Sequence, residues 1–386
     1  SDCRASGNGG DGVSATGATT GCLAVGNAGW GVRAGGDAAA TTAVLNGNGI
    51  EAGGGAIGCS ARENAGIGIQ ADGATIESWA LDNGGSGIVG QVLDRCAVVR
   101  NGSGLTLAAP WASATATIVA ENEGAGVTKG TVASCVAHRN RGAGVSRASN
   151  VTDSWIVGNA GNGVEATGAV ESSSILDNAS VGVLGKQGPP YTSVTSSTVA
   201  GNDGSGIGSA GPVQGCNLFS NASGYDYEET RPSSELTEAD AQFNFWGTTT
   251  TQLMAAHPFG SHYNIPAIHD FVDNAELAEA NYSGQAAAEI AGAGPGEAAP
   301  AFLLSVAIAP GPDNIASVGR TTFTLTFSKA MAPERLSVTF GAEAPYDAHV
   351  VAPVSGGWSD ARTWVGAFAV DAGVQDGPQR LRVSGA

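Results

Sequence analysis

The chain has 386 residues, with 35 acidic against 17 basic side chains and a formal net charge of −18. An acidic chain without a basic patch is unsuited to bind nucleic acid or an anionic membrane surface. No run of about 18 apolar residues occurs, so we expect no membrane-spanning helix, and the length leaves room for two or three domains.

A repeat centred on an asparagine organises residues 1–224. The segment NAGIGI at 64–69 returns with small changes, for example as NAGNGV at 159–164. A fixed period of about 19 residues is typical of a solenoid, in which each unit is too small to bury a face alone and stacking supplies the core. The recurring asparagines are Asn8, Asn27, Asn46, Asn64, Asn83, Asn101, Asn122, Asn140, Asn159, Asn178, Asn202 and Asn221.

A second column, five residues before each asparagine, contains only Cys, Ser and Thr. All 6 cysteines of the chain fall in it, and an Ala, Val, Ile or Leu follows two positions later. Alternation of period two indicates a strand, and each unit is too short for a helix as well. We therefore predict an all-β fold, a parallel β-helix of about 12 coils stacked roughly 4.8 Å apart. The cysteines should be small buried thiols in one interior file.

The order of a Cys or Ser, an outward residue, an apolar residue and then an inward Asn resembles the right-handed parallel β-helix repeats of pectate-lyase-like proteins. The resemblance covers residues 1 to about 224. It implies a right-handed β-helix and is specific for the fold rather than for an activity. The stacked asparagines would bond amide to amide and to the backbone at the turn, as ladders of identical amides do.

A set of apolar side chains alternates with the inward columns and so should point outward. A contiguous apolar wall over many coils exceeds what a soluble monomer usually exposes. We interpret it as a packing face for another copy, for the C-terminal domain or for a flat surface. The alternatives are that a loop covers it, or that the outward assignment is wrong in several coils. The wall consists of Leu23, Val25, Val44, Trp79, Leu81, Val99, Ile118, Val136, Trp155, Val157, Leu176 and Phe219.

Residues 225–283 differ in character from the repeat. They contain FNFWGTT at 243–249, IHDFVD at 268–273 and then a tyrosine. This segment resembles the closing segment of many secreted bacterial and archaeal β-helix proteins. The resemblance implies a cap over the unpaired backbone and apolar bore of the last coil. Two of its carboxylates, at 270 and 273, are also a candidate calcium pair. The cap residues would be Phe243, Asn244, Trp246, Gly247, Asp270, Asp273 and Tyr282.

The remaining residues predict a linker and a second domain. Residues 284–301 are rich in Ala, Gly and Pro, which indicates a linker. Residues 302–386 alternate short strands and turns, which suggests a β-sandwich. The segments 323–331, 358–366 and 376–386 resemble bacterial immunoglobulin-like modules of surface proteins. Such modules normally continue with a final strand, so the domain is expected to be incomplete, or completed by a longer parent chain or a neighbour.

The outward position just before each asparagine is of mixed sign and sits at a corner, so no catalytic residue is named and we favour a protein that is not an enzyme. It holds Glu63, Asp82, Arg100, Glu121, Arg139 and Asp177. We predict an extracellular structural protein on a prokaryotic cell surface. It would assemble through the apolar wall with other copies of itself or with other surface proteins, and could form filaments. The alternative is a polysaccharide lyase or hydrolase, or a carbohydrate-binding adhesin with Trp79 and Trp155 as sugar platforms. Apart from the calcium pair, no cofactor is expected.

Overall fold

The structure is a computed structural model that describes residues 1–186, 188–208, 210–222, 224–235, 238–296, 298–310, 316, 318–331, 336–342, 346–375, 377 and 379–384. The chain forms two compact units, Ser1–Pro300 and Ala301–Ala386, and each is described by itself.

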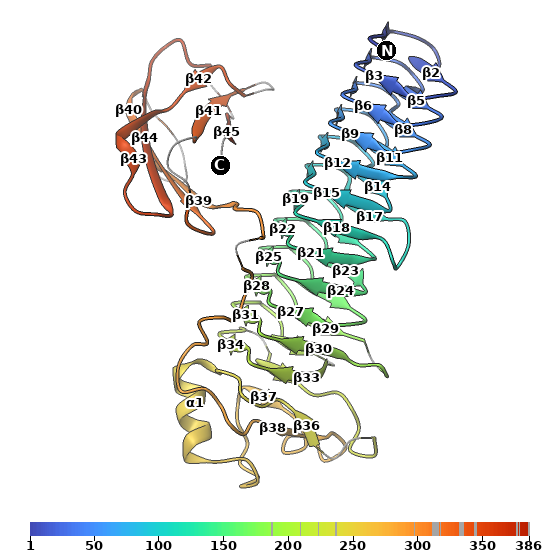
Figure 1. Cartoon of the computed structure of the whole chain (residues 1–386). Coiled ribbons are helices and arrows are strands. Elements are labelled where there is room, and N and C mark those ends of the chain that lie inside the picture. Colours follow the sequence, from blue (N-terminus) through green and yellow to red (C-terminus); the bar gives the residue numbers. More distant parts are fainter. Residues whose placement is uncertain are drawn as a thin grey trace. The chain divides into compact units, whose positions relative to one another are not determined.

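The first unit is a parallel β-solenoid of about 12 coils, in which three sheets run along the whole rod (Figure 1). Each of coils 1–11 contributes one short strand to each sheet, and a strand pairs with the equivalent strands of the neighbouring coils. Ala61, for example, is in register with Ala43 and Ala80. The predicted parallel solenoid is therefore confirmed.

The strands of the three sheets have the following bounds. The first sheet contains β1 (Arg4–Ser6), β4 (Leu23–Val25), β7 (Thr42–Val44), β10 (Ser60–Arg62), β13 (Trp79–Leu81), β16 (Ala97–Val99), β19 (Ile118–Ala120), β22 (Val136–His138), β25 (Trp155–Val157), β28 (Ser174–Leu176), β31 (Thr198–Ala200) and β34 (Asn217–Phe219). The second sheet contains β2 (Val13–Ala15), β5 (Trp30–Ala34), β8 (Asn48–Ala52), β11 (Ile69–Ala71), β14 (Ser86–Gly90), β17 (Ser103–Leu107), β20 (Val127–Thr128), β23 (Val145–Ala148), β26 (Val164–Ala166), β29 (Val183–Gly185), β32 (Ile207–Gly208), β35 (Tyr227–Glu228) and β37 (Ile268–His269). The third sheet contains β3 (Thr19–Thr20), β6 (Ala38–Ala39), β9 (Ala56–Ile57), β12 (Ala74–Ile76), β15 (Val92–Asp94), β18 (Ser113–Thr115), β21 (Thr131–Ala133), β24 (Asn150–Thr152), β27 (Val170–Glu171), β30 (Thr192–Thr195) and β33 (Ala210–Gln214). We number the coils 1 to 12 by the strands of the first sheet, from β1 to β34.

The asparagines form a continuous ladder at the turn between the first and second sheets. Asn27 donates its backbone N–H and its Nδ2 to Asn46 Oδ1, at 3.0 and 2.8 Å. The same pair of bonds links each ladder residue to the next, up to Asn221. The predicted ladder is confirmed. At its end a carboxylate takes the place of the amide, because Asp226 Oδ1 accepts from the backbone N–H and Nδ2 of Asn221, at 3.2 and 2.8 Å.

The Cys, Ser and Thr column lies in the interior, as predicted. All the cysteines are free, and all are buried except Cys3 in coil 1. Ser78 shows why a hydroxyl fits the same file, because its Oγ accepts the N–H of Cys59 at 3.1 Å. The thiols play a similar part, since Cys135 Sγ donates to the carbonyl of Ala133 at 3.2 Å. Cys, Ser and Thr can therefore replace one another in this column, because each bonds to the backbone at the same corner.

The segment after coil 12 closes the end of the rod. It contains β36 (Glu238–Asp240), α1 (Gly247–Ala256) and β38 (Glu279–Asn281). Asn244 Oδ1 accepts the N–H of Cys216 at 2.8 Å, and Trp246 is 1% exposed. An ion pair is buried here as well, because Arg231 and Glu229 are almost fully enclosed and the hydroxyl of Tyr227 donates to Glu229 at 2.7 Å.

The second unit consists of two antiparallel sheets around one apolar core, to which Phe323, Leu325, Phe340 and Trp364 contribute. The last two residues of the predicted domain, at 385 and 386, lie outside the described residues, as do 376 and 378. The four-stranded sheet has β39 (Leu303–Ala309), β40 (Gly319–Phe327), β44 (Thr363–Val370) and β43 (Ala352–Trp358), and the three-stranded sheet has β42 (His349–Val350), β41 (Ser337–Gly341) and β45 (Arg380–Ser384).

Candidate functional site

The predicted wall lies on the outer face of the first sheet. Each strand of this sheet has three residues, of which the middle one points into the bore and the outer two point away from it. In β13, Ala80 is fully buried between the outward Trp79 and Leu81. The structure brings all the wall residues onto this one face, in two columns. The first-position column holds Leu23, Trp79, Ile118, Val136 and Trp155, and the third-position column holds Val25, Val44, Leu81, Val99, Val157, Leu176 and Phe219.

The wall is a narrow stripe whose side chains mostly shield one another. Trp79 is the most open member, at 46% exposed, whereas Val44 and Val136 are buried. Trp79 stands between small residues, because it is in register with Ser60 in the coil before and with Ala97 in the coil after. Its side chain therefore projects beyond the smaller side chains of the two neighbouring coils.

The segment 284–296, expected to be a linker, starts at the cap, where the N–H of Ala286 bonds to the carbonyl of Asn244, and then lies along the same face over coils 9–12. We call it the strap. The side-chain amide of Asn217 accepts the N–H of Ile290 at 2.8 Å and donates to its carbonyl at 3.1 Å, as a neighbouring strand would. The hydroxyl of Thr198 donates to the carbonyl of Ala293 at 2.7 Å. The N–H of Gly296 bonds to Asp153 Oδ1 at the start of coil 9.

Sequence reasoning missed this contact, although the first-position column carried a signal for it. That column is mostly apolar in coils 2–9 and becomes polar at Ser174, Thr198 and Asn217 in coils 10–12. Two of these three side chains hydrogen-bond the strap. Ser174 is only 5% exposed beneath it. The change from apolar to polar side chains therefore coincides with the covered part of the face.

The uncovered part of the stripe carries one unpaired charge. Arg62, in the third position of β10, is half-buried and forms no ion pair within the described part of the chain. His138 lies on the same face in coil 8, but burial lowers its pKa to about 4. It is therefore neutral at neutral pH. From coil 2 to coil 8 the face is mostly apolar, but Thr42, Ser60 and Arg62 make coils 3 and 4 more polar. Ala120 and Val136, in coils 7 and 8, are buried.

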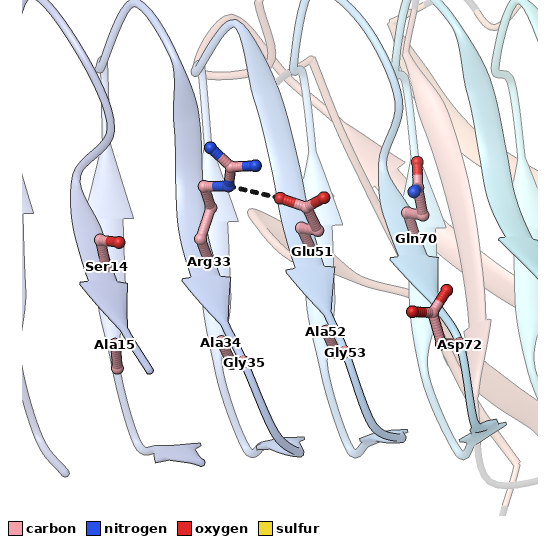
Figure 2. A pocket seen from close by; sticks show the side chains of 10 residues that line it. All are labelled: Ser14, Ala15, Arg33, Ala34, Gly35, Glu51, Ala52, Gly53, Gln70 and Asp72. Atoms are coloured by element: carbon pink, nitrogen blue, oxygen red, sulfur yellow. Dashed lines mark hydrogen bonds and ion pairs between the residues drawn. The ribbon is translucent and has the colours of Figure 1, made fainter. Parts of the chain in front are cut away.

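A shallow groove lies on the outer face of the second sheet in coils 1–4, with a volume of about 300 Å³. Figure 2 shows Ser14, Arg33, Glu51 and Gln70 side by side on successive strands along it. Arg33 Nε lies 2.5 Å from Glu51 Oε2. The hydrogen bond to Glu51 raises the pKa of Arg33. The groove thus holds one ion pair, between Arg33 and Glu51, beside small residues such as Ala34 and Gly53.

The exposed tryptophans lie apart from one another. Trp79 and Trp155, the predicted sugar platforms, are on the first sheet in coils 5 and 9, about 19 Å apart at roughly 4.8 Å per coil. Trp155 is only half-exposed. The most open tryptophan is Trp111, 80% exposed on the loop between β17 and β18, where Ser149 Oγ donates to the carbonyl of Pro110 at 2.7 Å.

The carboxylates of the predicted calcium pair accept hydrogen bonds from backbone N–H groups and from a side-chain amide. Asp270 accepts the N–H groups of Val272 at 3.0 Å and Ala280 at 2.8 Å, and burial raises its pKa. Asp273 Oδ1 accepts Asn264 Nδ2 at 2.7 Å. No group of three or more His, Cys, Asp or Glu side chains in the described part of the chain is placed to hold a metal ion.

The cap side chains have structural contacts. Tyr282 donates to the carbonyl of His257 at 2.8 Å, and Asn244 Nδ2 donates to the carbonyl of Val213 at 2.8 Å. Phe243 is 55% exposed, with φ of 60°. Gly247 begins α1 with φ of 73°, a conformation that favours glycine.

Comparison of the chain with protein-family models, with curated proteins and with solved structures finds no match. In the described residues, no helix has both the length and the apolar character needed to cross a membrane.

Proposed function

We propose that the first unit is a rigid extracellular rod that assembles with partner chains through the outer face of its first sheet. The second unit would be an immunoglobulin-like module of the same surface protein. The resemblance of residues 1–283 to secreted β-helix proteins supports the extracellular location. The three continuous parallel sheets support the structural role, because backbone bonds between every pair of coils resist bending.

One observation carries the proposal: the chain covers one end of this face itself and leaves the apolar end open. The strap lies over coils 9–12, where first-position residues such as Asn217 and Thr198 bond to it. Coils 5 and 6 instead present the side chains of Trp79, Leu81 and Val99. Burying apolar area yields about 25 cal/mol per Å², so an open stripe favours association.

The experiment compares assembly of the intact chain with that of a double variant, Trp79→Ser with Leu81→Ser. Light scattering and electron microscopy of negatively stained protein report the size and form of the assemblies. We expect the double variant to remain monomeric under conditions in which the unmodified chain associates. A matched control, Trp111→Ser with Ile57→Ser, removes apolar groups that are at least as exposed from other faces and should assemble normally. Assembly of the double variant at the unmodified level would reject the proposal.

A carbohydrate-binding rod is the second candidate, and the groove on the second sheet favours it. Arg33 and Glu51 place a guanidinium and a carboxylate side by side, which suits pairs of sugar hydroxyls. Trp111 offers an open ring on the loop after β17. Binding to a panel of polysaccharides should then fall in Arg33→Ala and in Trp111→Ser. The same binding should be unchanged in Trp79→Ser, because that residue lies on another sheet.

A further inference from the structure

We infer that a pocket at the capped end of the rod binds a neutral, hydroxyl-rich ligand, of the chemical class of a mono- or disaccharide. The pocket has a volume of about 400 Å³ and is lined by residues of coil 12, of α1 and of the strap, all within the first unit. It is separate from the groove on the second sheet, and the inference does not require the rod to assemble. Three features lead to it: a carboxylate at the end of the ladder, the uncapped start of α1 and an aromatic wall.

Asp226 provides the first feature, because the fold uses only one of its two carboxylate oxygens. Its Oδ1 accepts the backbone N–H and the Nδ2 of Asn221, at 3.2 and 2.8 Å, and so ends the ladder. Its Oδ2 accepts no hydrogen bond from the described part of the chain. Asp226 is 7% exposed and lines the pocket. A nearly buried carboxylate oxygen without a partner is costly, so a ligand that donates to it is favoured.

The start of α1 provides hydrogen-bond donors to the same pocket. The first four N–H groups of an α-helix have no partner within the helix. No side chain in the described part of the chain caps α1, and its first turn contains no acidic residue. The residues of this turn line the pocket, and they are Gly247, Thr248, Thr249 and Thr250. The pocket therefore combines free donors, and the partial positive charge of a helix start, with the carboxylate of Asp226.

The charges and polar groups of the pocket favour a ligand without net charge. Asp226 and the exposed Glu289 of the strap both line the pocket, and they would repel an anion at the helix start. A cation would bring no acceptor for the N–H groups of α1. Most of the other polar side chains are uncharged hydroxyls, from Ser220 and the three threonines of the first turn. A hydroxyl both donates and accepts, so a ligand with several hydroxyls can bond to the carboxylates and to the helix start together.

An aromatic wall completes the pocket. Phe219 and Phe245 line it, with ring centroids 6.0 Å apart and an angle of 67° between the rings. Sites for small ligands are typically about 300–1,000 Å³ in volume and combine aromatic walls with a few polar groups. A sugar ring matches this composition, because the C–H groups on its face can lie against a phenyl ring while its hydroxyls reach the polar groups at the sides.

The test titrates the intact chain with neutral disaccharides by isothermal titration calorimetry, at a pH of about 8, which is well above the ordinary pKa of a carboxyl group. The probes are lactose, maltose and cellobiose, and we expect saturable binding of at least one of them. Asp226→Asn keeps an oxygen to end the ladder and removes the charge that faces the ligand. Binding should therefore weaken about tenfold or more. The matched control, Asp177→Asn, makes the same change at an exposed corner of coil 10 and should bind as the unmodified chain does.

A second variant separates loss of the site from loss of the fold. Thr248→Asp places a carboxylate in the first turn of α1, where an acidic side chain stabilises a helix. The new carboxylate would also accept from the N–H groups that the ligand needs. We expect binding to weaken about tenfold or more, with no decrease in the unfolding midpoint.

Several results would overturn the inference. It fails if none of the three disaccharides binds, or if Asp226→Asn and Thr248→Asp both bind them as the unmodified chain does. Tighter binding of glucuronate or of glycine than of the disaccharides would also reject it, because the pocket would then select an anion or a zwitterion. Sugar binding that is lost in Arg33→Ala but kept in Asp226→Asn would belong to the groove on the second sheet. The carbohydrate-binding candidate would then stand while the site at the cap would be rejected.

Discussion

Replacing one asparagine in the middle of the ladder should strongly destabilise the rod. Asn140 Oδ1 accepts the backbone N–H and the Nδ2 of Asn122, at 3.1 and 2.9 Å. Its own Nδ2 donates to the carbonyl of Val119 at 3.2 Å and to Asn159 Oδ1 at 2.9 Å. All three asparagines are at most 1% exposed, so water cannot replace the lost partners without entering the core.

The magnitude of this effect follows from the donors that Asn140→Ala leaves unpaired. The backbone N–H of Asn122 and one of its two Nδ2 hydrogens lose their acceptor, while Nδ2 keeps its bond to the carbonyl of Val98. An unsatisfied buried group costs about 1–3 kcal/mol. Asn159 Oδ1 keeps one bond, from the backbone N–H of residue 140. We therefore expect the free energy of unfolding to fall by about 2–6 kcal/mol.

Urea unfolding of the intact chain, followed by circular dichroism, measures this difference. The control is Thr152→Ala, an outward position in the same coil, where a surface change should alter stability by about 0.5 kcal/mol or less. A solenoid couples neighbouring coils, so the loss should appear as earlier unfolding of a cooperative block rather than of one coil. If Asn140→Ala and Thr152→Ala unfolded at the same urea concentration, the ladder would not be the stabilising element described here.

Three further predictions concern buried ionisable groups. Burial raises the pKa of Asp226, so its contribution to stability is complete below its ordinary pKa and is lost as pH rises through the raised value. Asp226→Asn, which keeps the acceptor oxygen, should therefore raise the unfolding midpoint at neutral pH and flatten its pH dependence between acid and neutral conditions. Burial also raises the pKa of Cys135 to about 12. A thiol reagent at mildly alkaline pH should therefore label only the exposed Cys3 in the native chain, and all 6 cysteines after unfolding. Rapid labelling of Cys135 in the native chain would contradict its burial. Arg231→Met should cost about 3–5 kcal/mol because it leaves the buried Glu229 unpaired, and adding Glu229→Gln should recover part of that loss in the same unfolding assay.

The fold could be predicted from the sequence because its signals are local and repeated. Each coil has an asparagine at the turn and a small residue five positions earlier, as at Asn64 and Cys59, and this pair recurs in every coil. The parallel register then follows from aligning equivalent positions. The paired Arg33 and Glu51 could have been found in the same way, by comparing outward positions of neighbouring coils in the second sheet.

The strap could not be predicted, because its contacts join residues far apart in the chain. Asn217 and Ile290 are 73 residues apart, and nothing in an Ala- and Gly-rich segment specifies the sheet on which it lies. Its composition indicates a linker, since few side chains in it can bury apolar area. The hydrogen bonds that Asp270 accepts from the backbone of Val272 and Ala280 could not be predicted either, because they depend on the local turn.

The claim that the open stripe is a contact surface can be tested on the unmodified protein by hydroxyl-radical footprinting. Oxidation of Trp79 and of Trp111 is measured by mass spectrometry as the protein, or its mixture with a partner, is brought to concentrations at which it associates. Both side chains are open to solvent in the single chain, at 46% and 80% exposed. The account predicts that Trp79 becomes protected upon association while Trp111 stays reactive. Equal reactivity of Trp79 before and after association would contradict it.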